Sequence, residues 1–156
     1  MTMQFANVWE RVADTVGDEI ALINGEKKSS WSSFDSKAAK IANILEEYGL
    51  KSDSKVGIYL HNSNEYLEAQ YGVFKIEGVP INVNYRYKEN ELIYLLDNAD
   101  AEAVFFQGCY ADRIKAIKDQ LPKIKVYIQV DDGTEPLMED AIDFENSISS
   151  SKEQKR

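Results

Sequence analysis

The stretch from Val56 to Asn84 constrains the fold more than any other part of this 156-residue sequence. Val56–Leu60 is apolar, partly β-branched and bounded by polar residues, which predicts a buried strand, and Val79–Val83 predicts a second one. The residues between them predict a helix that is apolar on much of its circumference, and such a helix is deeply packed. Two strands joined through a helix lie parallel with a right-handed crossover. The stretch therefore predicts one unit of a parallel α/β sheet.

Local signals define the ends of this helix. Asn62 is the expected N-cap, because Glu65 three residues later completes the pattern of a capping box. Gly78 suits the position after the last turn, and Pro80 prevents the helix from continuing. Gly72 inside the helix costs about 1 kcal/mol relative to alanine, which predicts a close approach of another backbone. Three side chains on this helix and the next are expected in the core: Leu67, Phe74 and Leu96.

Strands and helices alternate through the rest of the chain. Asn24-Gly25 predicts a hairpin between strands Ile20–Ile23 and Lys27–Trp31. A first helix is expected at Phe5–Val16, with Phe5, Val8, Trp9, Val12 and Val16 on its apolar stripe. Further helices are expected from Ser32 or Ser33 to about Tyr48, at Lys88–Asn98 and at Tyr110–Leu121, and further strands at Ala101–Gln107 and Lys123–Val130. The alternation predicts an α/β fold, a doubly wound and largely parallel sheet with flanking helices.

The C-terminal part changes character. Lys123–Val130 alternates apolar and polar residues, which is typical of a strand near an edge with one buried face. Glu139–Ile148 is compatible with a short helix, and Ser149–Arg156 is serine-rich and charged with nothing to bury. We therefore expect one partial subdomain over residues 1–148, followed by a disordered tail or a truncated linker over residues 149–156.

Composition excludes several classes of protein. A hydrophobic content of 44% is typical of a globular chain, and a formal net charge of -9 disfavours nucleic acid and anionic membrane surfaces as partners. The single cysteine, Cys109, cannot form an internal disulfide and favours a reducing compartment. The sequence has no basic start followed by an apolar run, and no apolar run approaches the ~20 residues of a membrane span. The expected location is the cytoplasm.

Ligands of open α/β sheets bind beyond the carboxyl ends of the strands, and here three polar segments follow strands. They are His61-Asn62, Asn84-Tyr85-Arg86 and Gln107-Gly108-Cys109. His61 is a candidate base if Glu65 orients it, and its simpler interpretation is a polar residue beside a helix cap. Arg86 between two tyrosines is a candidate phosphate ligand, and its simpler interpretation is an arginine stacked on an aromatic ring in a solvated loop.

Several chemical signatures are missing from the sequence. It contains neither Gly-x-x-x-x-Gly-Lys-Ser/Thr nor Gly-x-Gly-x-x-Gly, and its eight glycines are scattered singly. No loop can therefore wrap a phosphate with successive backbone amides. There is no His/Cys cluster with zinc spacing and no calcium-loop spacing of carboxylates. We accordingly assign no catalytic, cofactor-binding or metal-binding residue, and we name His61, Asn84 and Arg86 only as positions at a ligand-binding rim.

From Trp31 to about Ile148 the sequence resembles the start of the adenylate-forming (AMP-binding) superfamily, the acyl-CoA synthetases and their relatives. The matching pieces are, in order, Trp31-Ser-Ser-Phe-Asp, Val56-Gly-Ile-Tyr-Leu-His-Asn-Ser-Asn-Glu65, Phe74-Lys-Ile-Glu-Gly-Val-Pro-Ile-Asn-Val-Asn-Tyr-Arg-Tyr87 and Glu91-Leu-Ile-Tyr-Leu-Leu-Asp-Asn-Ala-Asp100. The segment Asn-Val-Asn-Tyr-Arg-Tyr is most similar to the corresponding segment of fatty-acyl-CoA ligases. Ser52-Asp53-Ser54-Lys55 departs from the usual Gly-Asp before the first core strand, which changes a turn and not the fold.

The resemblance implies an N-terminal part of an enzyme that joins a carboxylic acid to ATP, releases pyrophosphate, and transfers the acyl group from AMP to coenzyme A. Mg²⁺ accompanies the ATP in such enzymes. Their phosphate loop, adenine-binding stretch, ribose-binding aspartate and C-terminal lysine have no counterpart in these 156 residues, so no catalytic residue carries over and this chain alone is expected to be inactive. The implied partners are a small carboxylic acid and the remaining regions of the same enzyme.

The alternative is a free-standing, non-catalytic α/β module that binds a ligand or regulates a partner through the rim of His61, Arg86 and Gln107. ATP binding by the isolated chain distinguishes the two hypotheses, because only an independent module is expected to bind it with micromolar affinity.

Overall fold

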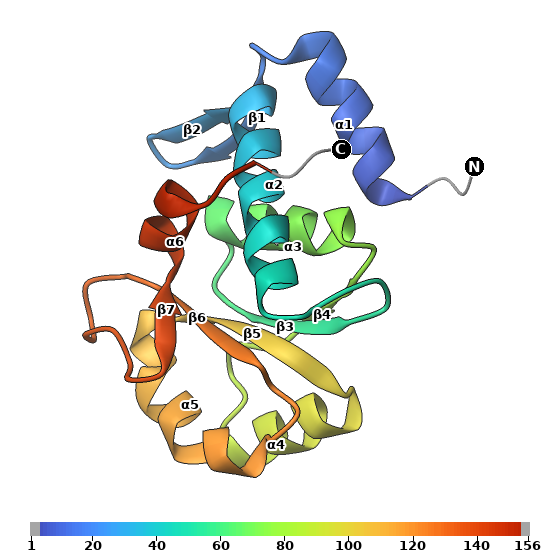
Figure 1. Cartoon of the computed structure of the whole chain (residues 1–156). Coiled ribbons are helices and arrows are strands. Elements are labelled where there is room, and N and C mark those ends of the chain that lie inside the picture. The colour runs from blue at the N-terminus through green and yellow to red at the C-terminus, as the bar shows by residue number, and fades with distance from the viewer. Residues whose placement is uncertain (1–3, 154–156) are drawn as a thin grey trace.

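A computed structural model describes residues 4–153 and contains a five-stranded parallel sheet (Figure 1). The strand order is β4-β3-β5-β6-β7, with β3 at Lys55–Tyr59, β4 at Val79–Asn82, β5 at Ala101–Gln107, β6 at Val126–Val130 and β7 at Ala141–Asp143. The predicted neighbours pair as expected, because β3 is parallel to both β4 and β5. The α/β fold with a parallel sheet and flanking helices is confirmed.

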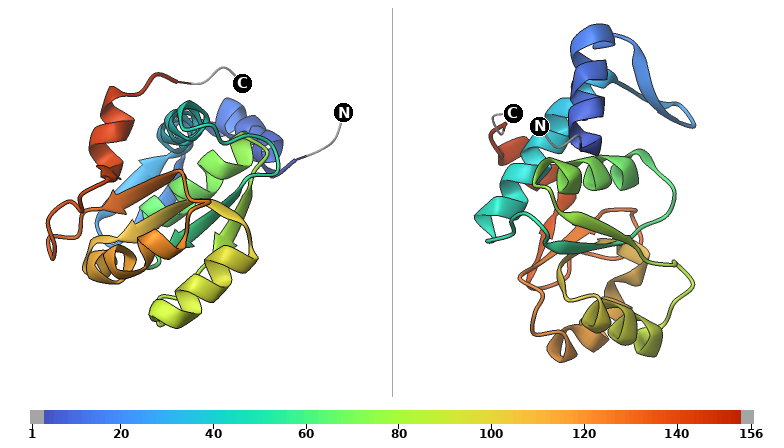
Figure 2. Two further views of the ribbon diagram at one scale, coloured as in Figure 1. Left: turned by 60° about the horizontal axis from the view of Figure 1, so that its bottom comes forward. Right: turned by 90° about the vertical axis from the view of Figure 1, so that its right-hand side faces the viewer.

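Helices cover both faces of the sheet (Figures 1 and 2). One face carries α2 (Trp31–Glu47), α3 (Asn64–Lys75) and α6 (Phe144–Ser150), and the other carries α4 (Glu89–Asn98) and α5 (Ala111–Ile117). Short 3-10 turns at Gly108–Tyr110 and Lys118–Gln120 flank α5, so the predicted helix over residues 110–121 is divided. A third layer, α1 (Phe5–Val16) with the hairpin β1 (Ile20–Asn24) and β2 (Lys27–Ser30), packs on the outer side of α2 and α3.

Close packing of α2 against α3 explains the glycine inside α3. A Cβ atom added at Gly72 would lie 2.4 Å from Cγ2 of Ile41 on α2 and 3.2 Å from the carbonyl oxygen of Ala38. Only glycine allows the two helices to approach this far, so the close approach predicted at this residue is confirmed. The helix pair buries its shared apolar surface between the sheet and the outer layer, since Ile41 is 2% exposed and Ala38 is fully buried.

The start and the faces of α3 differ from the prediction. Ser63, not Asn62, is the N-cap, and its side chain accepts a hydrogen bond from the backbone N–H of Tyr66. Leu67 is 36% exposed and not part of the core, because it lines an open groove beside β1. Phe74 is half-buried at the edge of the outer layer, whereas Leu96 on α4 is 1% exposed as predicted.

The apolar stripe predicted for α1 is also partly wrong. The fully buried residues of this helix are Ala6 and Ala13, while Phe5 is 68% exposed and Val8 is 43% exposed. Small side chains face inward because α1 lies tightly against α2 and α3. Phe5 still contacts the domain by stacking on Phe74 with ring centroids 5.2 Å apart.

The C-terminal elements extend the sheet beyond the expected edge. All five residues of β6 are buried, including Tyr127 and Gln129, because helices cover both faces of the strand: Ile128 packs in the cluster that includes α6, and Tyr127 packs in the cluster that includes α5. The outer edge of β6 is paired with β7. The side chain of Gln129 donates to the Pro136 carbonyl and accepts from the backbone N–H of Met138, which satisfies it inside the structure. The prediction of one exposed face is therefore wrong for β6, and the edge is formed by β7.

The segment predicted as one short helix over Glu139–Ile148 contains β7 followed by α6. Ser149 and Ser150 form the last turn of α6, and the Asn43 side chain of α2 donates to the Ser151 hydroxyl at 3.0 Å. This part of the expected tail is therefore ordered, and residues 154–156 lie outside the described residues. The division into residues 1–148 and 149–156 stays a prediction. Within residues 4–153, no helix combines the length and the apolar character of a membrane span.

Candidate functional site

The carboxyl ends of β3, β4 and β5 meet at one edge of the sheet and bring the predicted rim residues together. The backbone N–H of His61, after β3, donates to Oε1 of Gln107, the last residue of β5, at 3.4 Å. The ring of Tyr85, in the loop after β4, lies edge-on to the ring of His61 with centroids 5.7 Å apart. Three segments that are distant in the sequence therefore form one rim.

His61 is exposed and held by tyrosines, not by a carboxylate. Its Nε2 shares a hydrogen bond of 2.7 Å with the Tyr110 hydroxyl, and its ring is edge-on to the Tyr110 ring at 5.4 Å. Glu65, the expected orienting group, forms an ion pair of 3.7 Å with Lys27 on β2. The arrangement of a histidine base with Glu65 is therefore not present.

Arg86 lies beside the Tyr85 ring in an exposed loop, as its simpler interpretation describes, and its role as a phosphate ligand stays a prediction. Its guanidinium lies 5.6 Å from the centroid of the Tyr85 ring, and its Nε donates to the Tyr85 hydroxyl at 3.3 Å. The side chain is nevertheless exposed, so most of its donors face solvent. Oδ1 of Asn84 accepts from the backbone N–H of Arg86 at 2.9 Å, which shapes the loop into a tight turn. In the structure the Asn84 side chain sets the backbone geometry of the loop, and its place at a ligand-binding rim stays a prediction.

Two residues that the sequence did not single out lie directly beneath this loop. Tyr59, the last residue of β3, is fully buried, and its hydroxyl donates to the carbonyl of Tyr87 at 2.7 Å. Nη1 of Arg113 on α5 donates to the Tyr59 hydroxyl at 2.8 Å and to the same carbonyl at 3.1 Å. Burial raises the pKa of the Tyr59 phenol despite the nearby guanidinium, so the hydroxyl keeps its proton.

A comparison with protein families identifies this architecture. The model of a family described as AMP-binding enzyme matches residues 9–155. The chain belongs to the AMP-binding enzyme family. It is 36% identical over 135 residues to a 3-oxocholest-4-en-26-oate–CoA ligase of Rhodococcus rhodochrous, which covers 86% of the chain and 24% of that protein. It is 29% identical over 157 residues to the medium-chain acyl-CoA ligase Mig of Mycobacterium avium, which covers 92% of the chain and 28% of that protein.

Solved structures share the fold at low sequence identity. The anthranilate CoA ligase AuaEII in complex with anthranoyl-AMP superimposes with a TM-score of 0.88 at 19% identity, over 96% of this chain and 28% of that one. The N-terminal domain of FACL13 from Mycobacterium tuberculosis gives a TM-score of 0.85 at 17% identity, over 99% of this chain and 38% of that domain. This AMP-binding chain therefore spans about a quarter of the length of the curated relatives and has the fold found in an N-terminal domain.

The described part of this AMP-binding chain does not form a cradle for a triphosphate. Its glycines with positive φ, at positions 25, 49 and 133, lie in separate turns, so no series of backbone amides converges on one point. No group of three or more His, Cys, Asp or Glu side chains within residues 4–153 is placed to hold a metal ion.

Cys109, at the same rim, is not an activated thiol. Burial raises its pKa, and the neighbouring Asp132 carboxylate adds to that effect. The same carboxylate accepts from the backbone N–H of Cys109 at 3.0 Å, so its charge stays close to the sulfur. The thiol is protonated near neutral pH, and the residue is exposed.

Proposed function

We propose that this chain is the N-terminal part of an ATP-dependent CoA ligase for a carboxylic acid, with a fatty acid as the substrate. The observation that carries the proposal is the sequence identity to CoA ligases of carboxylic acids, 36% to a 3-oxocholest-4-en-26-oate–CoA ligase and 29% to a medium-chain acyl-CoA ligase. Such an enzyme uses ATP and Mg²⁺ to form an acyl-adenylate and pyrophosphate, and the coenzyme A thiol then displaces AMP. The single cysteine supports a cytoplasmic location.

Within that enzyme the chain supplies a scaffold and one charged rim. Arg86 is the position proposed to contact a phosphate group, because its guanidinium is exposed, held in place by Tyr85, and able to bind two phosphate oxygens at once. His61 and Asn84 are proposed as neighbours of that ligand at the rim. As a polypeptide of 156 residues the chain is expected to be inactive, since adenylation requires aligned donors for the triphosphate and a metal site.

A chimeric enzyme tests the proposal. The matching 135-residue segment of the Rhodococcus ligase is replaced by the corresponding residues of this chain, and acid-dependent exchange of labelled pyrophosphate into ATP is measured with a panel of short to long carboxylic acids. We expect exchange by the chimera and none by the 156-residue chain alone. A soluble, folded chimera without exchange would contradict the assignment, and micromolar ATP binding by the isolated chain in calorimetry would support an independent binding module.

The role of Arg86 is tested in the same chimera by Arg86→Ala. Loss of a charge-assisted contact to a phosphate is worth about 1.5–3 kcal/mol, so KM for ATP or for coenzyme A should rise by roughly ten- to a hundredfold. Arg11→Ala is the matched control, because it removes the same charge from an exposed position on α1, in the outer layer. Equal KM values for the two variants would remove Arg86 from the site.

A further inference from the structure

We propose that Tyr59 and Arg113 are positioning residues that fix the loop from Asn84 to Lys88 and thereby hold Arg86 at the rim. The inference rests on the proposed function for the meaning of Arg86, but the positioning itself is a property of this chain. Tyr59 and Arg113 both act through the backbone of the loop.

The geometry of the loop motivates the inference. Its internal hydrogen bonds are local: Oδ1 of Asn84 accepts from the N–H of Arg86, and the Asn84 carbonyl accepts from the N–H of Tyr87 at 3.0 Å. Such bonds shape a turn but do not attach it to the sheet. The attachment after Arg86 is made at the carbonyl of Tyr87, which accepts from both the Tyr59 hydroxyl and Nη1 of Arg113.

Tyr59 is unusually well placed for this task. It ends the strand at the centre of the β4-β3-β5 array, is fully buried, and has its hydroxyl 3.4 Å from a second loop carbonyl, that of Tyr85. Arg113 completes the arrangement by donating to the oxygen of Tyr59, which leaves the phenol proton free for the loop. The two donors therefore secure the residue after Arg86, and the Tyr59 hydroxyl also lies close to the carbonyl of the residue before it.

The same pair also reaches the other rim residue. The Tyr59 ring stacks on the Tyr110 ring with centroids 4.4 Å apart, and the Arg113 guanidinium lies 5.0 Å from the Tyr110 centroid. Tyr110 in turn carries the hydrogen bond to His61. The Tyr59 phenol and Arg113 thus support both Tyr110, which holds His61, and the loop of Arg86. The positions of His61 and Arg86 relative to each other are fixed by this shared support.

Hydrogen exchange on the 156-residue chain tests the positioning directly. Tyr59→Phe keeps the ring and removes the donor, and we expect the Arg86 and Tyr87 amides to exchange about three- to tenfold faster, as loss of one net hydrogen bond implies. Arg113→Met should produce a similar increase. Tyr94→Phe is the matched control, because Tyr94 is 73% exposed on α4 and its change should leave these amides unaffected. The urea midpoint separates a local effect from global unfolding.

Kinetics of the chimeric ligase supply the second readout. Tyr59→Phe should raise the same KM that Arg86→Ala raises, with little change in kcat, and should have no further effect in the Arg86→Ala background. Unchanged loop exchange in both Tyr59→Phe and Arg113→Met would overturn the inference, as would fully additive effects of Tyr59→Phe and Arg86→Ala. An inactive chimera would count against the proposed function alone, because the exchange measurement does not require catalysis.

Discussion

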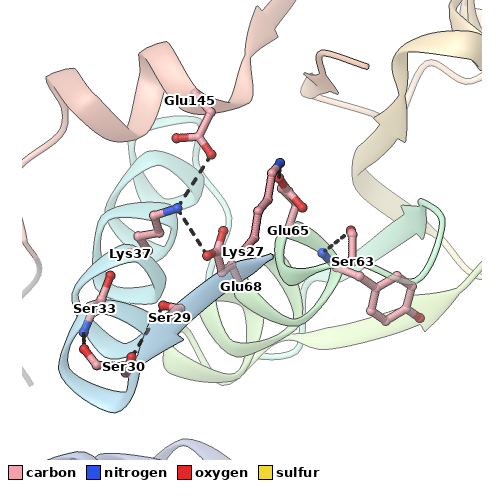
Figure 3. A network of polar contacts seen from close by, with 10 residues as sticks. Lys27, Ser29, Ser30, Ser33, Lys37, Ser63, Glu65, Glu68 and Glu145 are labelled. Carbon is pink, nitrogen blue, oxygen red and sulfur yellow. Dashed lines mark hydrogen bonds and ion pairs between the residues drawn. The ribbon is translucent and has the colours of Figure 1, made fainter. Parts of the chain in front are cut away.

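Replacement of Glu68 by glutamine tests the most unusual ion pair of the fold (Figure 3). Glu68 on α3 is 1% exposed, and its Oε1 lies 3.2 Å from Nζ of Lys37 on α2. The same Lys37 nitrogen reaches Oε1 of Glu145 on α6 at 3.6 Å. Oε2 of Glu68 has no hydrogen-bond partner. Lys37 therefore pairs with two carboxylates, and only one of the two oxygens of the buried Glu68 carboxylate has a polar partner.

Burial and like charges decide how Glu68 titrates. Burial raises the pKa of Glu68, attraction to Lys37 opposes this, and repulsion by Glu65 and Glu145 adds to the rise. Glu65 is itself paired with Lys27, so Lys37 is the only cation in contact with Glu68 among the described residues. The pKa of Lys37 is also raised, because two carboxylates outweigh its own burial. The charged lysine is thus favoured in the folded state while the charged Glu68 is not.

The sign of the stability effect follows from the raised pKa. The folded chain binds the Glu68 proton more tightly than the unfolded chain, in which the pKa of this carboxyl is close to 4.5. The contribution of this group to stability is therefore complete below that pH and is lost as the pH rises through the folded pKa. Glu68→Gln removes the titration, so the free energy of unfolding of the wild type relative to the variant should fall between pH 4.5 and neutrality.

The expected magnitudes at neutral pH separate the two members of the pair. Glu68→Gln should change the free energy of unfolding by about 1 kcal/mol or less, since a buried ion pair is often neutral relative to an uncharged replacement. Lys37→Met leaves the buried Glu68 carboxylate without its ion-pair partner and should lower the free energy of unfolding by about 3 kcal/mol. The double variant should regain most of that loss, because the stranded charge is gone.

Urea unfolding of the four proteins between pH 4.5 and 8 measures these quantities. The reasoning is refuted if Glu68→Gln leaves the pH dependence of the unfolding free energy unchanged, or if Lys37→Met destabilises equally in the presence and absence of Glu68. Hydrogen exchange in α6 supplies a structural check, since Lys37 also holds Glu145 of that helix.

Two further predictions concern the attachment of the outer layer and the assignment of the core. The side chain of Lys75 on α3 is 4% exposed, and its Nζ forms ion pairs with Glu10 of α1 at 2.6 Å and with Asp35 of α2 at 3.0 Å. Lys75→Met should therefore lower the free energy of unfolding by about 3–5 kcal/mol and accelerate amide exchange in α1, and a loss below about 1 kcal/mol in urea unfolding would contradict this. Leu96→Ala should lower the free energy of unfolding by about 2–5 kcal/mol, whereas Leu67→Ala should lower it by less than about 1 kcal/mol, because Leu96 is buried and Leu67 is exposed. Similar urea midpoints for the two variants would contradict this difference in burial.

Short-range patterns in the sequence predicted most helices and strands and the pairing of β3 with β4 and β5, but not β7. The β-branched segments at Val56–Leu60 and Ala101–Gln107, separated by amphipathic helices, led to parallel neighbours, because a helical crossover allows little else. The rim followed from the same logic, since the carboxyl ends of parallel strands meet at one edge. The AMP-binding family was identified from the sequence for a different reason, namely the similarity of residues 74–87 to the corresponding segment of known members.

Only the tertiary structure decided which faces are buried and which partners polar groups find. Leu67 belongs to an apolar helix but lines an open groove beside β1, and Phe5 is 68% exposed on α1, because the neighbouring elements and not the periodicity set the exposure of a side chain. Glu65 is close to His61 in sequence but pairs with Lys27 from the hairpin. Tyr59 and Arg113 are 54 residues apart, and no local pattern indicates that they converge on one carbonyl; that contact exists because β3 and α5 are brought together by the sheet.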